Sequence, residues 1–190
     1  MRDLTIGFAI TGSFCTFKAV FPQMNLLVEH GYRVLPIMSE NAYATDTRFG
    51  RAADWAAQAE EICGEKVIHT IAQAEPIGPK KLLDLLVVAP CTGNSLAKIA
   101  AGITDTPVTL SVKSHLRNGR PVLIAVSTND GLGQSAKNIG ALLPVKNVFF
   151  VPFGQDDPIE KPNSLVAKFD LIPEAALQAL NGRQIQPVLR

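Results

Sequence analysis

The feature that most constrains the fold of this chain is the alternation of short apolar runs with longer segments of helical periodicity. Parallel strands joined by crossover helices produce this alternation. The apolar runs are nearly continuous in Val, Ile and Leu, which indicates strands that are buried on both faces of a sheet. We expect six strands, the third of them short, at residues 4–10, 32–38, 66–70, 83–89, 120–127 and 147–153.

The segments between these runs predict helices. Residues 14–30 carry an apolar stripe and are followed by Gly31, while Pro22 predicts a bend or a break in that helix. Residues 107–118 contain Thr and Val, which favour strand, but their apolar residues recur every four positions, which favours helix. The remaining helices are expected at residues 51–63, 94–101, 135–143 and 173–180.

Together these elements predict one α/β domain over residues 1–190, built as a doubly wound parallel sheet with helices on both faces. No stretch has the composition of a linker, and 190 residues are enough to bury a sizeable core. Residues 154–190 are expected to form a C-terminal loop and a helix.

The composition indicates a small ligand. The hydrophobic share of 47% and the charged share of 18% suit a sheet that is covered on both faces. The 18 basic residues nearly balance the 17 acidic ones, and no Lys/Arg block occurs. This charge pattern argues against nucleic acid and against an anionic membrane surface as partners.

The cysteines and the first residues favour a cytoplasmic protein. Cys15, Cys63 and Cys91 are odd in number and lack metal-ligand spacing, which fits a reducing compartment, and we assign no metal. The apolar run that begins after Asp3 is too short for a signal peptide or a membrane span.

The loops that follow the strands are the candidate binding segments, because ligands of open parallel sheets sit beyond the carboxyl ends of the strands. After the first strand, Gly12 and Ser13 permit a tight turn whose amides point at a phosphate; an ordinary helix cap is the alternative. After the second strand, Ser39 begins a polar segment that suits a ring or a ribose, and a simple loop is equally compatible.

The loop after the fourth predicted strand runs from Pro90 to Ser95 and is rich in small and amide-bearing residues. Such residues leave room for a flat ring and offer it donors and acceptors, and an Asn/Ser helix cap is the alternative, although six consecutive loop-type residues are more than a cap needs. Cys91 has no evident base, so we interpret it as space-filling rather than nucleophilic. The adjacent Asp156 and Asp157 indicate a turn rather than a metal site.

His69 is the one histidine expected on the ligand side, at the end of the third strand. It is a candidate catalytic residue, with a structural or solvated role as the alternative.

The segments ITGSFCTFKA and VVAPCTGNSLAKIAAGITD, together with Asn129, resemble the flavin-binding cysteine decarboxylase superfamily over about residues 4–135. Within it, APCTGNSLAKIAAGITDTPVT, RPVLIAVSTNDGLG, NVFFVPFGQDDP and KPNSLVAK resemble the family of the dipicolinate synthase B subunit over essentially the whole chain.

The resemblance implies a flavodoxin-like Rossmann sheet that binds FMN. By position, it assigns Gly12 and Ser13 to the phosphate and Ser39 to the phosphate or the ribityl chain. It also implies that three residues line the isoalloxazine, namely Pro90, Thr92 and Asn94. Asn129 falls where the decarboxylases contact the substrate carboxylate, and His69 falls near the place of their catalytic histidine.

The sequence also departs from the decarboxylases. They continue PAMN with further Met-containing sequence where this chain has STNDGLG, and they carry a cysteine in a C-terminal substrate clamp, whereas this chain has none after Cys91. The residues that follow His69, TIAQAEPIGPK, also differ from their pattern. These departures weaken a decarboxylase assignment.

The resemblance therefore implies an oxidoreductase subunit that takes part in oxidising dihydrodipicolinate to dipicolinate during sporulation, in the mother-cell cytoplasm of a spore-forming bacterium. It implies an NAD(P)-binding partner, the dipicolinate synthase A subunit, together with a homo-oligomer, and NADP is a second candidate for the crevice. The dianionic dicarboxylate needs a cation near the site. The candidates are Arg48, Lys113, Arg117 and Lys137.

Two alternatives stay open. One is a stand-alone flavin-dependent decarboxylase, and the other is a non-catalytic nucleotide-binding subunit that organises its NAD(P)-binding partner.

Overall fold

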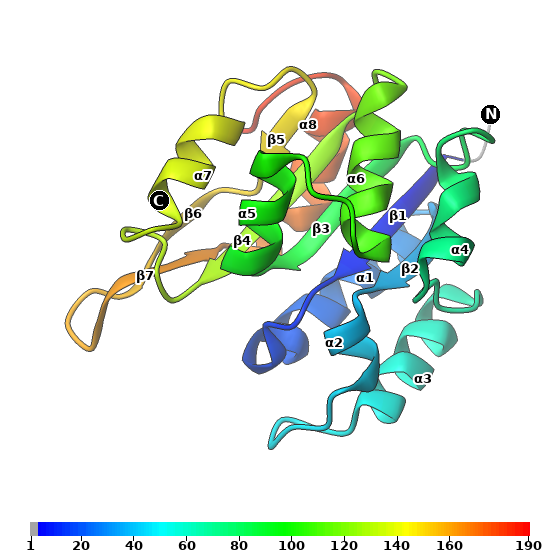
Figure 1. Cartoon of the computed structure of the whole chain (residues 1–190), viewed down its shortest axis with the longest axis horizontal. Helices are drawn as coiled ribbons and strands as arrows, with labels where there is room; N and C mark the ends of the chain where they lie inside the picture. Colours follow the sequence, from blue (N-terminus) through cyan, green and yellow to red (C-terminus); the bar gives the residue numbers. More distant parts are fainter. Residues whose placement is uncertain (1–3) are drawn as a thin grey trace.

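A computed structural model describes residues 4–190 and shows a central sheet flanked by helices (Figure 1). Its parallel part has the order β2-β1-β3-β4, and β5 pairs with the first half of β4. The predicted doubly wound parallel sheet is thereby confirmed. The strands are β1 (Thr5–Ile10), β2 (Arg33–Met38), β3 (Leu85–Cys91), β4 (Val122–Thr128) and β5 (Val148–Phe150).

The three central strands form the core of the molecule. Every residue of β1, β3 and β4 is buried, as their uninterrupted apolar runs predict. The helices α5 (Gly93–Ala101) and α6 (Pro107–Arg117) contact each other in front of the sheet in Figure 1. On the other face α1 (Phe17–Glu29) packs against α8 (Ile172–Leu180).

The peripheral helices complete the covering of the sheet. A 3-10 turn, η1 (Phe14–Thr16), leads directly into α1, and α3 (Ala52–Cys63) packs on α1 and β2. The other elements are α2 (Glu40–Ala44), α4 (Ile71–Ala74), η2 (Glu75–Ile77), α7 (Ala136–Leu142) and η3 (Phe169–Leu171).

Two ambiguous helices are now resolved. The segment that begins at Pro107 is a helix, because Thr106 and Thr109 form a capping box and a proline suits the first helical turn. Pro22 lies inside a continuous α1, so of the two predicted effects, a bend or a break, the break does not occur.

The third predicted strand, residues 66–70, is wrong. Only one bridge forms in it, between Ile68 and Ile37. Thr70 instead caps α4 through a capping box with Gln73, and this local pairing draws the chain into a helical turn.

The C-terminal segment contains a hairpin in addition to the expected loop and helix. Strands β6 (Phe153–Asp157) and β7 (Lys161–Ala167) pair antiparallel, and β7 pairs with Ser127 and Thr128 of β4. The hairpin therefore stands beside the carboxyl end of β4, where the β4 edge is free because β5 pairs only with Val122–Ile124. In Figure 1 it projects away from the helices.

None of the helices within residues 4–190 is both long enough and apolar enough to span a bilayer.

Candidate functional site

A cleft lies at the carboxyl ends of β1, β3 and β4, where the strand order reverses and open α/β sheets bind their ligands. It has two compartments, of about 1090 Å³ and about 650 Å³. The larger one is bounded by the loops after β1, β3 and β4 and by the β6–β7 hairpin, and the smaller one by the loops after β1, β2 and β3 and the start of α6. Both are lined by Gly12, Phe14, Thr92 and Asn94.

The loops after β1 and β3 are tied together by Thr11. Its buried hydroxyl donates to the carbonyl oxygen of Pro90 at 2.7 Å and accepts the N–H of Thr92 at 3.0 Å. Pro90 itself is buried and lines neither compartment. Pro90 therefore helps to hold the two loops together through its carbonyl, whereas the resemblance implied that it lines the isoalloxazine ring.

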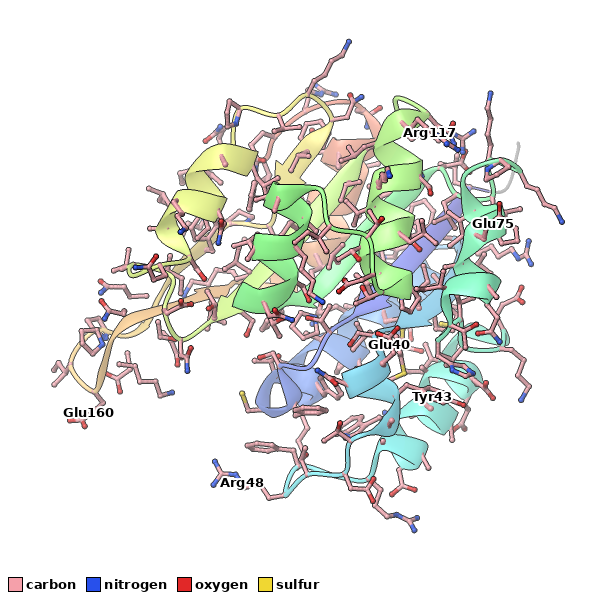
Figure 2. All side chains as sticks on the ribbon, in the orientation of Figure 1. Glu40, Tyr43, Arg48, Glu75, Arg117 and Glu160 are labelled. Atoms are coloured by element: carbon pink, nitrogen blue, oxygen red, sulfur yellow. The ribbon has the colours of Figure 1, made fainter. Side chains whose placement is uncertain are left out.

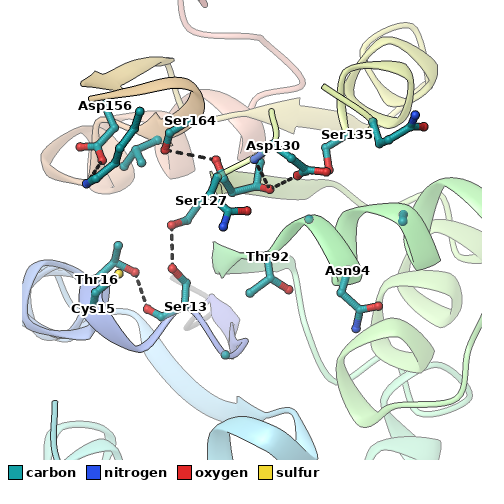
Figure 3. Close-up of a pocket in the computed structure, with 18 of the residues that line it drawn as sticks. Ser13, Cys15, Thr16, Thr92, Asn94, Ser127, Asp130, Ser135, Asp156 and Ser164 are labelled. Atoms are coloured by element: carbon teal, nitrogen blue, oxygen red, sulfur yellow. Dashed lines mark hydrogen bonds and ion pairs between the residues drawn. The ribbon is translucent and has the colours of Figure 1, made fainter. Parts of the chain in front are cut away.

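The turn at Gly12 and Ser13 faces both compartments in part, but its serine is already engaged. The Ser13 hydroxyl is 2.8 Å from that of Ser127, and its N–H donates to the Thr11 carbonyl at 2.8 Å (Figure 3). Since the first amides of a helical turn have no partner inside it, Phe14 and Cys15 present the free N–H groups. The N–H of Gly12 likewise has no backbone partner among the described residues, so these three amides are candidate donors to an anion.

Ser39 and Thr92 both line the smaller compartment and both act as helix caps. The Ser39 hydroxyl accepts the N–H of Ala42 at 3.3 Å, and the Thr92 hydroxyl accepts the N–H of Ser95 at 3.2 Å. Ser39 therefore begins a helix rather than the simple loop that was the alternative for it, and the position of both residues at the cleft leaves their binding role open as a proposal.

Five amide side chains face the cleft without a hydrogen-bond partner among the described residues. Asn41 lines the smaller compartment and Asn94 lines both, while the larger compartment alone is lined by Asn129, Gln134 and Asn138. A primary amide offers two donors and one acceptor, so this group supplies the polar partners that a heterocycle edge requires.

His69 lies outside the cleft. Its ring stacks on Tyr43, with 3.8 Å between centroids and 2° between planes, and it lines neither compartment. The structure does not bring this predicted catalytic residue together with Asn129.

Asp130 lines the larger compartment and was not among the site residues predicted from the sequence. Its carboxylate accepts the hydroxyl of Thr128 at 2.5 Å and that of Ser135 at 2.7 Å (Figure 3), and these bonds, Thr128 first, lower its pKa. A Cβ on Gly93 would approach the Thr128 oxygen to 2.6 Å, so only glycine lets the β3 loop close on this cluster. The sequence feature that could have indicated this cluster is the run Thr-Asn-Asp-Gly, because an aspartate in a turn can accept a hydrogen bond from a threonine two residues before it.

The hairpin contributes a second set of cleft residues that were not predicted as site residues from the sequence. Asp156, Lys161, Ser164 and Val166 line the larger compartment, and the Lys161 ammonium is 2.7 Å from the Asp156 carboxylate. The available sequence signal for a hairpin was a pair of short segments on either side of the turn at Pro158. The first of them, β6, is mostly polar and lacks the alternating hydrophobic pattern of a strand.

Of the four cation candidates, Lys137 alone lines the cleft. Arg48 lies 4.9 Å from the ring centre of Phe49, a lining residue of the larger compartment. Arg117 lies at the end of α6 beside Gly78, away from Glu40 at the cleft (Figure 2). Lys113 lines neither compartment.

Cys91 is fully buried under the cleft, and burial raises the pKa of its thiol to about 12. It is therefore a thiol at neutral pH, which confirms the space-filling interpretation. Over residues 4–190, no three side chains of the His, Cys, Asp and Glu types gather closely enough to hold a metal ion.

The strand order and the cleft at its switch point define a Rossmann-like α/β protein. The family model described as Flavoprotein matches residues 1–168. The B subunit of dipicolinate synthase from Bacillus subtilis (strain 168) is 50% identical over 189 residues, which cover 100% of this chain and 94% of that protein. The chain therefore belongs to the flavoprotein family and, within it, to the family of the dipicolinate synthase B subunit. The resemblance read from the loop motifs is confirmed.

Solved structures agree with this assignment. The crystal structure of the dipicolinate synthase B subunit from Bacillus halodurans C has a TM-score of 0.91 and 47% identity, and covers 98% of this chain and 96% of that one. An FMN-dependent cysteine decarboxylase, TvaF, shares the fold with a TM-score of 0.69 and 20% identity over 94% of this chain and 98% of that one.

Proposed function

We propose that this chain is the B subunit of a dipicolinate synthase and takes part in oxidising dihydrodipicolinate to dipicolinate during sporulation. The observation that carries the proposal is the 50% identity to the relative of that name over the full chain. The proposal includes the mother-cell cytoplasm as location and a homo-oligomer as the assembly. It also includes the dipicolinate synthase A subunit as the NAD(P)-binding partner, with the chemistry carried by either subunit.

We also propose that the cleft binds FMN. The free amides of Phe14 and Cys15 would hold the phosphate, because exposed N–H groups at the start of a helical turn favour an anion. Asn94 and Asn129 would bind the edge of the ring, and Phe14, which lines both compartments, would contact its face. The donor set thus suits an anionic tail and a planar heterocycle together.

A bound flavin accepts a hydride equivalent, which is what the oxidation of a dihydropyridine releases. The residues of this chain would position and orient the two rings. Thr11 would fix the distance between the loops after β1 and β3, since it bonds to both Pro90 and Thr92. NADP, bound by this chain or by its partner subunit, is the alternative acceptor.

An absorption titration of the purified chain with FMN tests the cofactor proposal, with Gly12→Asp and Gly12→Ala compared. The nearest atoms to a Cβ at Gly12 belong to the Phe14 ring, at 3.4 Å, and to Asn41, at 3.8 Å, so alanine fits and adds no charge. Aspartate puts a negative charge beside the proposed phosphate and should weaken FMN binding at least about tenfold, as expected for a lost charged hydrogen bond. Equal FMN binding by both variants would contradict the phosphate site.

The activity of this chain reconstituted with its partner subunit distinguishes the proposal from the two alternative functions. If the chain only organises that partner, Gly12→Asp should leave the pair fully active. If the chain is a stand-alone decarboxylase, it should turn over its substrate with tightly bound yellow cofactor and no partner. The proposal predicts neither outcome, because it requires both the partner and the cleft.

A further inference from the structure

The two compartments differ in their charged side chains. The smaller one is lined by Glu40, Asp105 and Lys98, and both carboxylate oxygens of Asp105 accept Lys98 at 2.9 Å. Because the lining cation Lys98 is already paired with Asp105, this compartment keeps an excess negative charge at Glu40. A ligand with two carboxylates would be repelled there.

The larger compartment has balanced charges, and both of its carboxylates are already supplied with donors. Asp130 accepts two hydroxyls, from Thr128 and Ser135. Asp156 accepts the ammonium of Lys161 at 2.7 Å. The remaining charged residue of its lining, Lys137 on α7, has no ion-pair or hydrogen-bond partner in the described part of the chain.

The two lysines reach the larger compartment from different walls. Lys161 begins β7 on the hairpin, while Lys137 follows Ser135 by two residues on α7. Figure 3 shows Asp156 on one side and Ser135 on the other, with Ser127 and Asp130 at the end of β4 between them. Two cations at separate walls suit a rigid ligand that carries two anionic groups.

We propose that the larger compartment binds a planar ring with two carboxylates, one carboxylate at Lys137 and the other at Lys161. Lys137 binds without giving up a partner. Lys161 exchanges Asp156 for the ligand, since the pair is solvent-exposed, with side chains 59% and 39% accessible, and therefore weak. The inference deepens the proposed function and rests on it, because it names the residues that would recognise the dicarboxylate.

Calorimetric titration of the full chain, with and without FMN, by pyridine-2,6-dicarboxylate tests this proposal, with pyridine-2-carboxylate as the one-charge probe. Lys137→Met and Lys161→Met should each weaken binding of the dicarboxylate about tenfold, the loss expected for one charge-assisted hydrogen bond. Lys146→Met is the matched control, because Lys146 is an exposed lysine that lines neither compartment. Asp156→Asn should strengthen binding, since it frees Lys161.

Three outcomes would overturn the inference: equal affinity of the unmodified chain for the two probes, no binding of the dicarboxylate, or losses no larger than that of Lys146→Met. Each leaves the proposed function standing as long as FMN still binds and the pair with the partner subunit still turns over. If the unmodified chain did not bind FMN, that result would instead count against the cofactor proposal alone.

Discussion

His115 shows how burial changes the chemistry of a single residue far from the cleft. It lies on α6 with 2% of its surface exposed, and its Nε2 atom has no hydrogen-bond partner among residues 4–190. Burial, and secondarily the charge of Arg120, lower its pKa to about 4. The imidazole is therefore neutral in the folded protein at physiological pH.

This pKa predicts a loss of stability in mild acid. The folded pKa lies below the ordinary value of 6.5, so between pH 6.5 and about 4 the unfolded chain binds a proton that the folded chain does not. The free energy of unfolding should fall over this window by about 3 kcal/mol at most. Urea unfolding measured from pH 7.5 to 4.5 checks the prediction.

His115→Asn should flatten the dependence of the unfolding free energy on pH between 6.5 and about 4, because the difference of one bound proton between the folded and unfolded chains is then removed. An unchanged slope in His115→Asn would show that another group titrates.

At the scale of elements, the cleft depends on how closely the loop at the start of α5 approaches the loop after β4. Gly93→Ala should destabilise the protein by about 2 kcal/mol, because a Cβ there would push apart the hydroxyls of Thr128 and Ser135 that bind Asp130. Thermal and urea unfolding give the measurement.

Gly140→Ala is the matched control for that substitution. Gly140 lies inside α7, and a Cβ there meets no atom within 4 Å. Alanine is the better helix former, so this variant should be more stable by about 0.5–1 kcal/mol. If both variants were stabilised, the close packing at Gly93 would be disproved.

The elements that were predicted correctly are those whose own residues specify them. The runs of β1, β3 and β4 are apolar throughout and are buried throughout, and α6 has its own capping box. The β6–β7 hairpin was missed because its polar strand is held by pairing with β7, and β7 by Ser127 and Thr128 of β4. Such pairing depends on a partner distant in sequence.

At the scale of the whole molecule, the buried parallel strands and the exposed hairpin should differ in local stability. In hydrogen–deuterium exchange, amides of β1, β3 and β4 should exchange slowest, and those of β6 and β7 much faster, because most hairpin residues are exposed or half-buried. Adding the cleft ligand should slow the hairpin selectively, since the hairpin lines the larger compartment.

Mass spectrometry of exchanged peptides resolves these segments. Helix α8, which packs on β3 and β4 on the face opposite α5 and α6, is the internal control and should not respond to ligand. Uniform protection of the hairpin before ligand addition would contradict this ranking.

The sequence by itself determined the class of fold, the strands of the core and the loops after β1, β3 and β4 that carry the cleft, because each depends on local hydrophobic pattern and turn chemistry. Tertiary structure alone decided which side chains meet there. Ser13 and Ser127, 114 residues apart, come within 2.8 Å, while His69 stacks on Tyr43 outside the cleft. The hydrophobic pattern of a segment indicates which of its residues are buried. The residues that they contact depend on the order of the strands in the sheet, which no single segment encodes.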